Sequence, residues 1–161
     1  RDQAKKFGTR IVDENVIEID FPKAGEKTSA VFPLRSSTAE VKAKSVIIAT
    51  GAKALWLNLP SETRLRGKGI SACATCDGFF QKGKAVAVMG GSDSAAGAAV
   101  YLSAIAEKVY LIYRKKELRC EQYWKNALNK AKNVEILTDA NVLEITGKTG
   151  VDGVKIGNLK K

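Results

Sequence analysis

The sequence predicts an α/β protein in which a parallel sheet with crossover helices follows a segment of β-strands. Three observations carry this prediction. Apolar runs of strand length alternate with helix-length stretches between residues 84 and 137. A glycine-rich turn stands between the first of these strands and the helix after it. Residues 9–51 instead contain several short stretches that alternate or are β-branched, which is typical of strands.

Length and composition indicate a globular chain. With 161 residues, 45% of them apolar and 27% charged, it fits one ordinary domain or pieces of two and is not disordered. No apolar run approaches the roughly 20 residues of a membrane helix, and the first residues are polar, unlike a signal peptide. We therefore expect no membrane association and a cytoplasmic location. The net charge of +10 is spread along the chain without a long basic run, so no nucleic-acid partner is expected.

The first part of the chain is predicted to be mainly β-structure. The stretch Ser45–Gly51 is rich in β-branched residues and predicts a buried central strand that ends in Thr50-Gly51. The elements expected before it are the end of a helix through Phe7 with Gly8 as its cap, two short strands within Thr9–Phe21, a turn at Pro22–Lys27, and strands at Ala30–Leu34 and Glu40–Ala43.

The second part is predicted to be a β-α-β-α-β unit with right-handed crossovers, followed by a hairpin. Before it, Ala52–Gly69 lacks periodicity and predicts a crossover between two domains, anchored by packing of Trp56 and Leu57. The expected elements are a strand at Lys84–Met89, an alanine-rich helix to about Ala106, a strand at Lys108–Tyr113, a helix at Glu117–Lys132, a strand at Asn133–Leu137, and a hairpin of Val142–Ile145 with Val151–Ile156.

A Cys-x-x-Cys motif, Cys73 and Cys76, is the strongest chemical signal in the chain. Two cysteines at this spacing can close a small disulfide and take part in thiol–disulfide exchange. Asp77 follows directly, where a carboxyl group can give a proton to a departing thiolate. A zinc site needs four ligands, and the chain has three cysteines and no histidine, so no metal is expected. A purely structural disulfide remains an alternative.

A second signal is the turn Gly90-Gly91-Ser92-Asp93-Ser94-Ala95, which lies between a predicted strand and a predicted helix. The dinucleotide-binding fingerprint G-x-G-x-x-G/A requires that context. Gly90 makes the tight turn and Ala95 keeps helix and strand close, but Ser92 stands where the middle glycine lets the backbone approach the pyrophosphate. The alternative is a plain strand-to-helix turn. The amides at the helix start remain available to bind phosphate, which favours a nucleotide site over a plain turn.

The residues after the next strand indicate which nucleotide is bound. NAD sites place an acidic residue about 20 residues after the glycines to hold the ribose hydroxyl. Here Tyr113, Arg114 and Lys115 occupy that place, and Arg119 follows one helical turn later. These cations fit a 2′-phosphate, so the sequence favours NADPH over NADH. A solvated basic helix start is the alternative, although helix electrostatics would not favour it.

Together these stretches resemble the low-molecular-weight NADPH-dependent thioredoxin reductases along nearly the whole chain. The most specific match is Gly69–Gly78, which contains the Cys-x-x-Cys motif. The resemblance also rests on Ile47–Ala52, Gly90–Ala95 and Val109–Lys115. The family's basic motif usually begins His-Arg-Arg, whereas this chain has Tyr113-Arg114-Lys115, which keeps two positive charges.

The resemblance implies FAD and NADPH as cofactors and thioredoxin or a similar small disulfide protein as partner. It implies that Cys73 attacks the partner's disulfide, that Cys76 faces the flavin and that Asp77 is the acid. It adds Thr50 and Gly51 to the predicted cofactor-binding residues and a homodimer as the expected state of the full-length protein. The implied division is a partial FAD-binding segment at 1–54, an interdomain crossover at 55–67 and the NADPH-binding domain at 68–161.

Two parts of the family pattern are not found in the sequence. No glycine-rich FAD fingerprint precedes Arg1, and no later FAD segment follows Lys161. The expectation is therefore part of a disulfide reductase, with the 161-residue chain inactive by itself. Two alternatives stay open: a catalytically inactive NADP(H)-binding module or truncated relative, and a reductase of a peroxiredoxin system.

Overall fold

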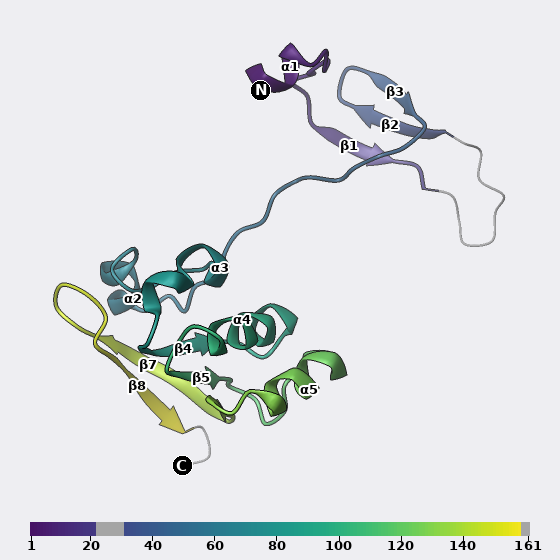
Figure 1. Ribbon diagram of the computed structural model, residues 1–161. Coiled ribbons are helices and arrows are strands. Elements are labelled where there is room, and N and C mark those ends of the chain that lie inside the picture. The colour runs from purple at the N-terminus through teal and green to yellow at the C-terminus, as the bar shows by residue number, and fades with distance from the viewer. Residues whose placement is uncertain (22–30, 159–161) are drawn as a thin grey trace. The chain divides into compact units, whose positions relative to one another are not determined.

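A computed structural model describes residues 1–21 and 31–158 of the chain. The chain divides into two compact units, Arg1–Ala52 and Lys53–Lys161 (Figure 1). The turn predicted at Pro22–Lys27 lies outside the described residues. Within the described part of the chain, no helix is long and apolar enough to cross a membrane.

The first unit contains a short helix, α1 (Asp2–Lys6), and a three-stranded antiparallel sheet. The strands, β1 (Val16–Ile19), β2 (Phe32–Ser36) and β3 (Glu40–Ala43), pair in the order β1-β2-β3. Gly8 has φ +81° just after the helix, as predicted for a cap. One strand, not two, forms within Thr9–Phe21.

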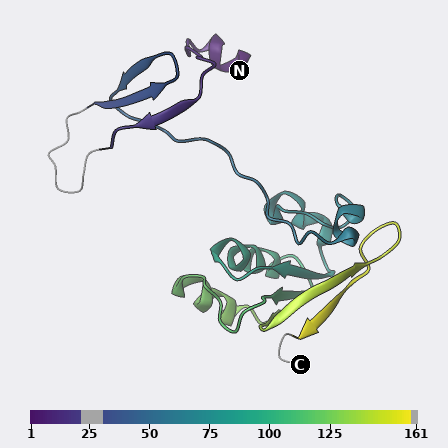
Figure 2. The ribbon, with the colours of Figure 1, turned by 180° about the vertical axis from the view of Figure 1, so that it is seen from behind.

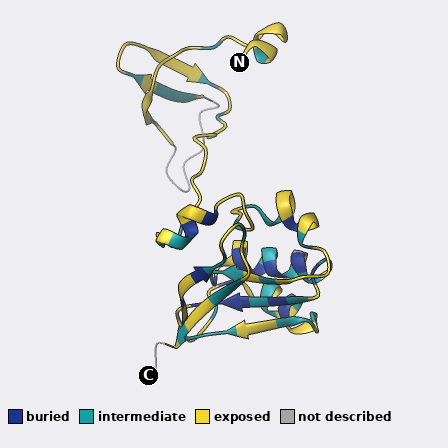
Figure 3. Cartoon of the chain, turned by 90° about the vertical axis from the view of Figure 1, so that its left-hand side faces the viewer, coloured by how far each residue is buried: buried dark blue, intermediate teal, exposed yellow. Residues whose placement is uncertain are grey.

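The prediction of a buried strand at Ser45–Gly51 is wrong, because this stretch forms no strand in the structure. Ile47 is 91% exposed and Ile48 is 65% exposed. A β-branched run becomes a buried strand only where a sheet edge supplies hydrogen-bond partners and an apolar layer covers it. The described part of the first unit supplies neither strand partners nor an apolar layer for Ser45–Gly51. None of the described residues of this unit is buried (Figure 3).

The second unit is built on a parallel sheet of β4 (Ala85–Met89), β5 (Lys108–Ile112) and β6 (Val134–Leu137), in that order. Helices α4 (Asp93–Ser103) and α5 (Gln122–Lys130) connect the strands. The predicted β-α-β-α-β order is therefore confirmed, and each strand agrees with its predicted range to within a residue or so.

Residues of β5 alternate between two layers, because successive side chains of a strand point to opposite faces. Val109 and Leu111 are fully buried in a core formed with helices α4 and α5. Ile112 is 3% exposed and belongs to a second core on the opposite face. The helices and the hairpin of β7 (Ala140–Thr146) and β8 (Gly153–Asn158) accordingly lie on opposite faces of the sheet (Figures 1 and 2).

The segment predicted as an irregular crossover contains a helix, α2 (Pro60–Leu65). Leu65 is fully buried in the core beneath the hairpin. The carboxylate of Glu62, which is 3% exposed, accepts hydrogen bonds from the backbone N–H groups of Leu57 and Asn58, both at 2.9 Å. The Arg66 guanidinium lies 4.0 Å from the centre of the Trp56 ring and anchors it, whereas Leu57 is 39% exposed, so the predicted anchoring by packing is not confirmed for Leu57.

Helix α5 begins at Gln122 rather than at the predicted Glu117. Its predicted start was wrong because the preceding residues bond to another loop instead of continuing the helix. Arg119 N–H donates to the carbonyl of Gly91 at 2.7 Å, and Glu121 N–H donates to the Asp93 carboxylate at 2.8 Å. Residues 114–121 are thus a loop held against the glycine turn.

Replacing Leu111 by Ala should lower the free energy of unfolding of the second unit by about 2–5 kcal/mol, because it deletes a fully buried side chain between sheet and helices. Leu143→Ala is the matched control, since Leu143 in β7 is 55% exposed and should cost much less. Urea unfolding of the 161-residue chain followed by circular dichroism measures both. Equal losses for the two variants would contradict the assignment of the core.

Candidate active site

Cys73 and Cys76 are joined by a disulfide, with their Cα atoms 5.3 Å apart. Cys73 is the cap of the short helix α3 (Ala74–Asp77), and its Sγ accepts a hydrogen bond from Cys76 N–H at 3.2 Å. Ser71 Oγ accepts from Cys73 N–H at 3.0 Å and so fixes the approach to the turn. The predicted cysteine pair is therefore held as a compact loop, with an amide directed at Cys73.

The pair is accessible from outside the second unit. Cys73 is half-buried, whereas Cys76 and Asp77 are exposed. Asp77 ends α3, and its backbone N–H donates to the carbonyl of Cys73 at 3.2 Å. The carboxyl group of Asp77 thus directly follows the second sulfur in an exposed position, where proton transfer to and from solvent is possible. Its role as the acid stays a prediction.

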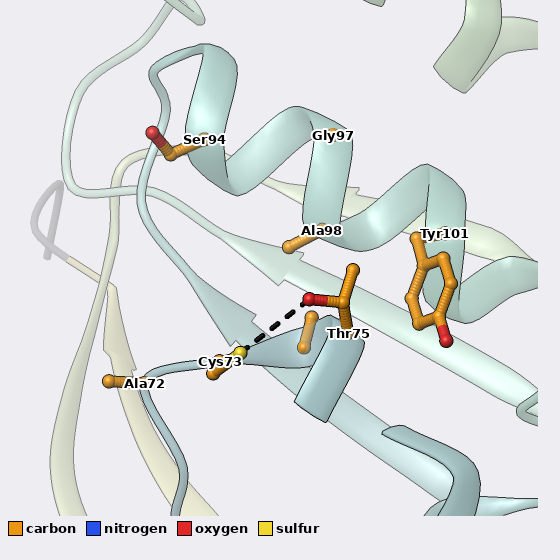
Figure 4. A pocket seen from close by; sticks show the side chains of 8 residues that line it. Ala72, Cys73, Thr75, Ser94, Gly97, Ala98 and Tyr101 are labelled. Carbon is orange, nitrogen blue, oxygen red and sulfur yellow. Dashed lines mark hydrogen bonds between the residues drawn. The ribbon is translucent and has the colours of Figure 1, made fainter. Parts of the chain in front are cut away.

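A hollow of about 290 Å³ lies between the cysteine loop and helix α4. The side chains of Cys73 and Thr75 face this helix, with the two side-chain atoms Sγ and Oγ1 3.5 Å apart (Figure 4). Gly78 brings the loop close, because a Cβ there would lie 2.8 Å from Leu102. The lining consists of small residues and hydroxyl-bearing side chains: Ala72, Cys73, Ala74, Thr75, Ser94, Gly97, Ala98 and Tyr101.

The glycine turn needs both of its glycines. Gly90 has φ +134°, and its N–H donates to the carbonyl of Ile112 at 3.0 Å. A Cβ at position 90 would lie 2.9 Å from the Cβ of Ala95, which is the close approach of turn and helix that the fingerprint predicts. A Cβ at position 91 would lie 2.6 Å from the ring of Tyr113. The turn therefore packs directly on the end of β5.

Ser92, the departure from the glycine fingerprint, fits the turn without backbone strain. It has φ −95° and ψ 178°, which any L-residue adopts, and it is exposed at the cap of α4. Its carbonyl accepts the first helical bond, from Ala96 N–H at 3.0 Å. Ser92 and Ser94 thus present hydroxyl groups at the surface of the helix start, beside the amides that could hold a phosphate.

The basic residues after β5 lie beside this turn. Arg114, Lys115 and Arg119 are exposed, and the bond from Arg119 N–H to Gly91 brings their loop to the glycines. Lys116, which belongs to the same basic cluster but is not among the predicted cofactor-binding residues, adds a fourth exposed cation to the loop. The loop and the turn together bring four exposed cations to one edge at the ends of the parallel strands, beside the exposed carboxylates of Asp93, Glu117 and Glu121.

Tyr113, predicted to contact the cofactor, is only 6% exposed, and its ring lies against Gly91. Its hydroxyl is buried without a hydrogen-bond partner among the described residues. Its ring thus packs directly against the turn, and a direct contact with a cofactor stays a prediction. Thr50 and Gly51 belong to the first unit, where both are exposed. Their part in cofactor binding also stays a prediction.

The second unit thus combines a nucleotide-type turn on a parallel sheet with a cysteine pair packed along the same helix. This combination is typical of nucleotide-dependent oxidoreductases that carry a disulfide. The family model "Pyridine nucleotide-disulphide oxidoreductase" matches residues 2–161. The chain belongs to this family.

Known relatives agree with this assignment. A thioredoxin reductase of Rickettsia conorii is 41% identical over 160 residues, which cover 98% of this chain and 50% of the relative. The solved structure of a thioredoxin reductase from Giardia duodenalis matches with a TM-score of 0.75 and 35% identity, over 99% of this chain and 50% of that one. A protein of Pseudomonas fluorescens named glucosaminate ammonia-lyase is 41% identical over 162 residues, 98% of this chain and 49% of that protein. The chain spans about half the length of the curated relatives it matches.

Replacing Gly91 by Ala should destabilise the second unit by about 1–3 kcal/mol, because the added Cβ would overlap the Tyr113 ring. Ser92→Ala is the neighbouring control and should change stability by less than about 0.5 kcal/mol, since the Ser92 side chain makes no cap bond. The penalty should shrink in a Gly91→Ala, Tyr113→Ala double variant. Thermal unfolding measures all of them, and a strictly additive double variant would show that the two residues do not clash.

Proposed function

We propose that this chain is part of an NADPH- and FAD-dependent reductase that reduces thioredoxin or a similar small disulfide protein through Cys73 and Cys76. The observation that carries the proposal is that helix α4 contacts both the glycine turn and the cysteine loop. The helix begins at the glycine turn, and the cysteine loop packs along its side through Gly78 and Leu102. Relatives named thioredoxin reductase support the choice of partner.

The geometry of the pair supports Cys73 as the attacking sulfur. In the dithiol form, the N–H of Cys76 would donate to a Cys73 thiolate, as it does to this Sγ in the disulfide. The Cys73 thiolate attacks one sulfur of the partner disulfide, and the other partner sulfur leaves as a thiolate. Cys76 then attacks Cys73 Sγ, which releases the second partner sulfur and restores the Cys73–Cys76 disulfide. Two electrons pass to the partner, and Asp77 stands where it can protonate a leaving thiolate.

The residues at the glycine turn fit a phosphorylated dinucleotide. Helix α4 has 11 residues, and the amides of its first turn, with the exposed Ser92 and Ser94, suit a pyrophosphate. The loop with Arg114, Lys115 and Arg119 suits the additional 2′-phosphate. When bound, NADPH supplies a hydride and FAD passes the electron pair on to a disulfide. The chain's own contribution is to hold the phosphates and to keep the cysteine loop in place.

Three parts of the proposal rest on the family resemblance alone. These are the contact of Thr50 and Gly51 with a cofactor, the homodimer and the cytoplasmic location. The Pseudomonas fluorescens relative, which carries a different name at the same level of identity, makes a direct test of disulfide reduction necessary.

A single-turnover experiment tests the disulfide chemistry without any cofactor. The chain is reduced with dithiothreitol, freed of reductant and mixed with oxidised thioredoxin. We expect transfer of one electron pair per chain, with the Cys73–Cys76 disulfide reformed in the peptide mass spectrum. Cys73→Ser should transfer none. Cys120→Ala is the control and should transfer as much as the wild type, because Cys120 is 4% exposed and unpaired.

Other outcomes of this experiment are equally informative. Transfer to an oxidised peroxiredoxin but not to thioredoxin would change the partner in the proposal. Absence of transfer to either, or zinc bound to the cysteines, would refute the redox role.

Nucleotide preference is tested by titrating the chain with NADPH and NADH. Arg114→Ala should weaken NADPH binding by roughly tenfold or more, since a charge-assisted bond to phosphate contributes about 1.5–3 kcal/mol. NADH lacks the 2′-phosphate and should bind with unchanged affinity. Lys130→Ala removes an exposed cation at the far end of α5 and should affect neither. An unchanged ratio of the two affinities in Arg114→Ala would mean that the basic loop does not read the phosphate.

A further inference from the structure

The loop of residues 114–121 is attached to the glycine turn at both ends. Just before it, the Tyr113 ring packs against Gly91. At its end, the Asp93 carboxylate accepts a hydrogen bond of 2.8 Å from Glu121 N–H, across 28 residues of sequence. Between them, Arg119 N–H donates to the Gly91 carbonyl at 2.7 Å. Arg119 is therefore placed by the glycine turn, whereas the start of the loop is also held by the segment after β6, where Asp139 N–H donates to the carbonyl of Lys115 at 3.1 Å.

The charge of Asp93 is unfavourable for the ligand that this turn is proposed to bind. A carboxylate in the first turn of α4 stabilises the helix, but it repels a phosphate bound at the same helix start. A carboxylate has no hydrogen-bond donor to offer a phosphate, so Asp93 is not expected to be a phosphate ligand itself. What the carboxylate does in the structure is to accept the Glu121 N–H and so to close the loop before α5 begins.

We propose that Asp93 is a positioning residue that strengthens the preference for a 2′-phosphorylated nucleotide by holding the end of the basic loop, which carries Arg119, against the glycine turn. This inference rests on the proposed binding of NADP(H). A pyrophosphate would be bound by the turn and the helix start, whereas the 2′-phosphate depends on cations of the 114–121 loop. Loosening the loop should therefore weaken NADPH binding and leave NADH binding almost unchanged.

Two substitutions separate the acceptor from the charge. Asp93→Ala removes both, and Asp93→Asn keeps an oxygen that can accept the Glu121 N–H. We expect Asp93→Ala to weaken NADPH binding about five- to tenfold, whereas NADH should bind as tightly as to the wild type or more tightly, because the repelling charge is gone. Asp93→Asn should bind NADPH at least as tightly as wild type. Glu107→Ala, which removes an exposed carboxylate after α4, is the matched control and should change neither affinity.

Amide hydrogen exchange of the nucleotide-free chain reports on the loop directly. Asp93→Ala should increase the exchange rate of the Glu121 amide about tenfold or more, and Asp93→Asn should increase it much less. If Asp93 acted only through its charge, both variants would instead bind NADPH more tightly, without a change in the exchange rate of the Glu121 amide. If Asp93 only stabilised the fold, Asp93→Ala would weaken the binding of NADPH and NADH equally.

Either of those two patterns overturns the proposal, as does an Asp93→Ala variant with wild-type affinities. Failure of the underlying function looks different, because a wild-type chain that binds neither nucleotide would refute the proposed function and this inference together.

Discussion

The close packing of helix α4 on the parallel sheet is the contact on which the rest of the second unit depends. Ala96 and Ala99 are fully buried against β5, where Val109 and Leu111 are buried as well. Small side chains let the helix axis approach the strands, and well-packed apolar contacts of this kind dominate the stability of a domain. Gly97, also in α4, lets α5 approach in the same way. A Cβ on Gly97 would lie only 3.2 Å from the ring of Trp124 in α5.

Because α4 is fixed in this way, the two chemical sites attached to it are fixed too. Its first residues follow the glycine turn, and its last turn carries Leu102, against which Gly78 places the cysteine loop. A helix of 11 residues is about 16 Å long at 1.5 Å per residue. The disulfide and the nucleotide turn are thus held by one rigid element, without requiring a contact between their own side chains.

The parts of the fold that sequence reasoning predicted are those with strong local signals. The strands around Val86 and Val109 are apolar runs bounded by turns, and the glycine turn and cysteine spacing are local motifs. The missed parts depend on distant partners. Helix α2 is short and is held by Leu65 under the hairpin, and α5 starts late because Glu121 bonds to Asp93. Ser45–Gly51 has a strand's composition, but a strand also needs neighbours that no local pattern specifies.

The two departures from the family pattern near the glycine turn, Ser92 and Tyr113, have different effects on the structure. Ser92 is exposed and unstrained, so its extra atoms add a hydroxyl where a ligand would lie and leave the turn intact. Tyr113 is buried, and its ring requires a glycine at position 91. Its hydroxyl has no partner in the described structure, and a buried hydroxyl in that condition costs free energy. Tyr113 therefore contributes mainly through the shape of its ring, and the exposed charges beside the turn belong to the loop that follows it.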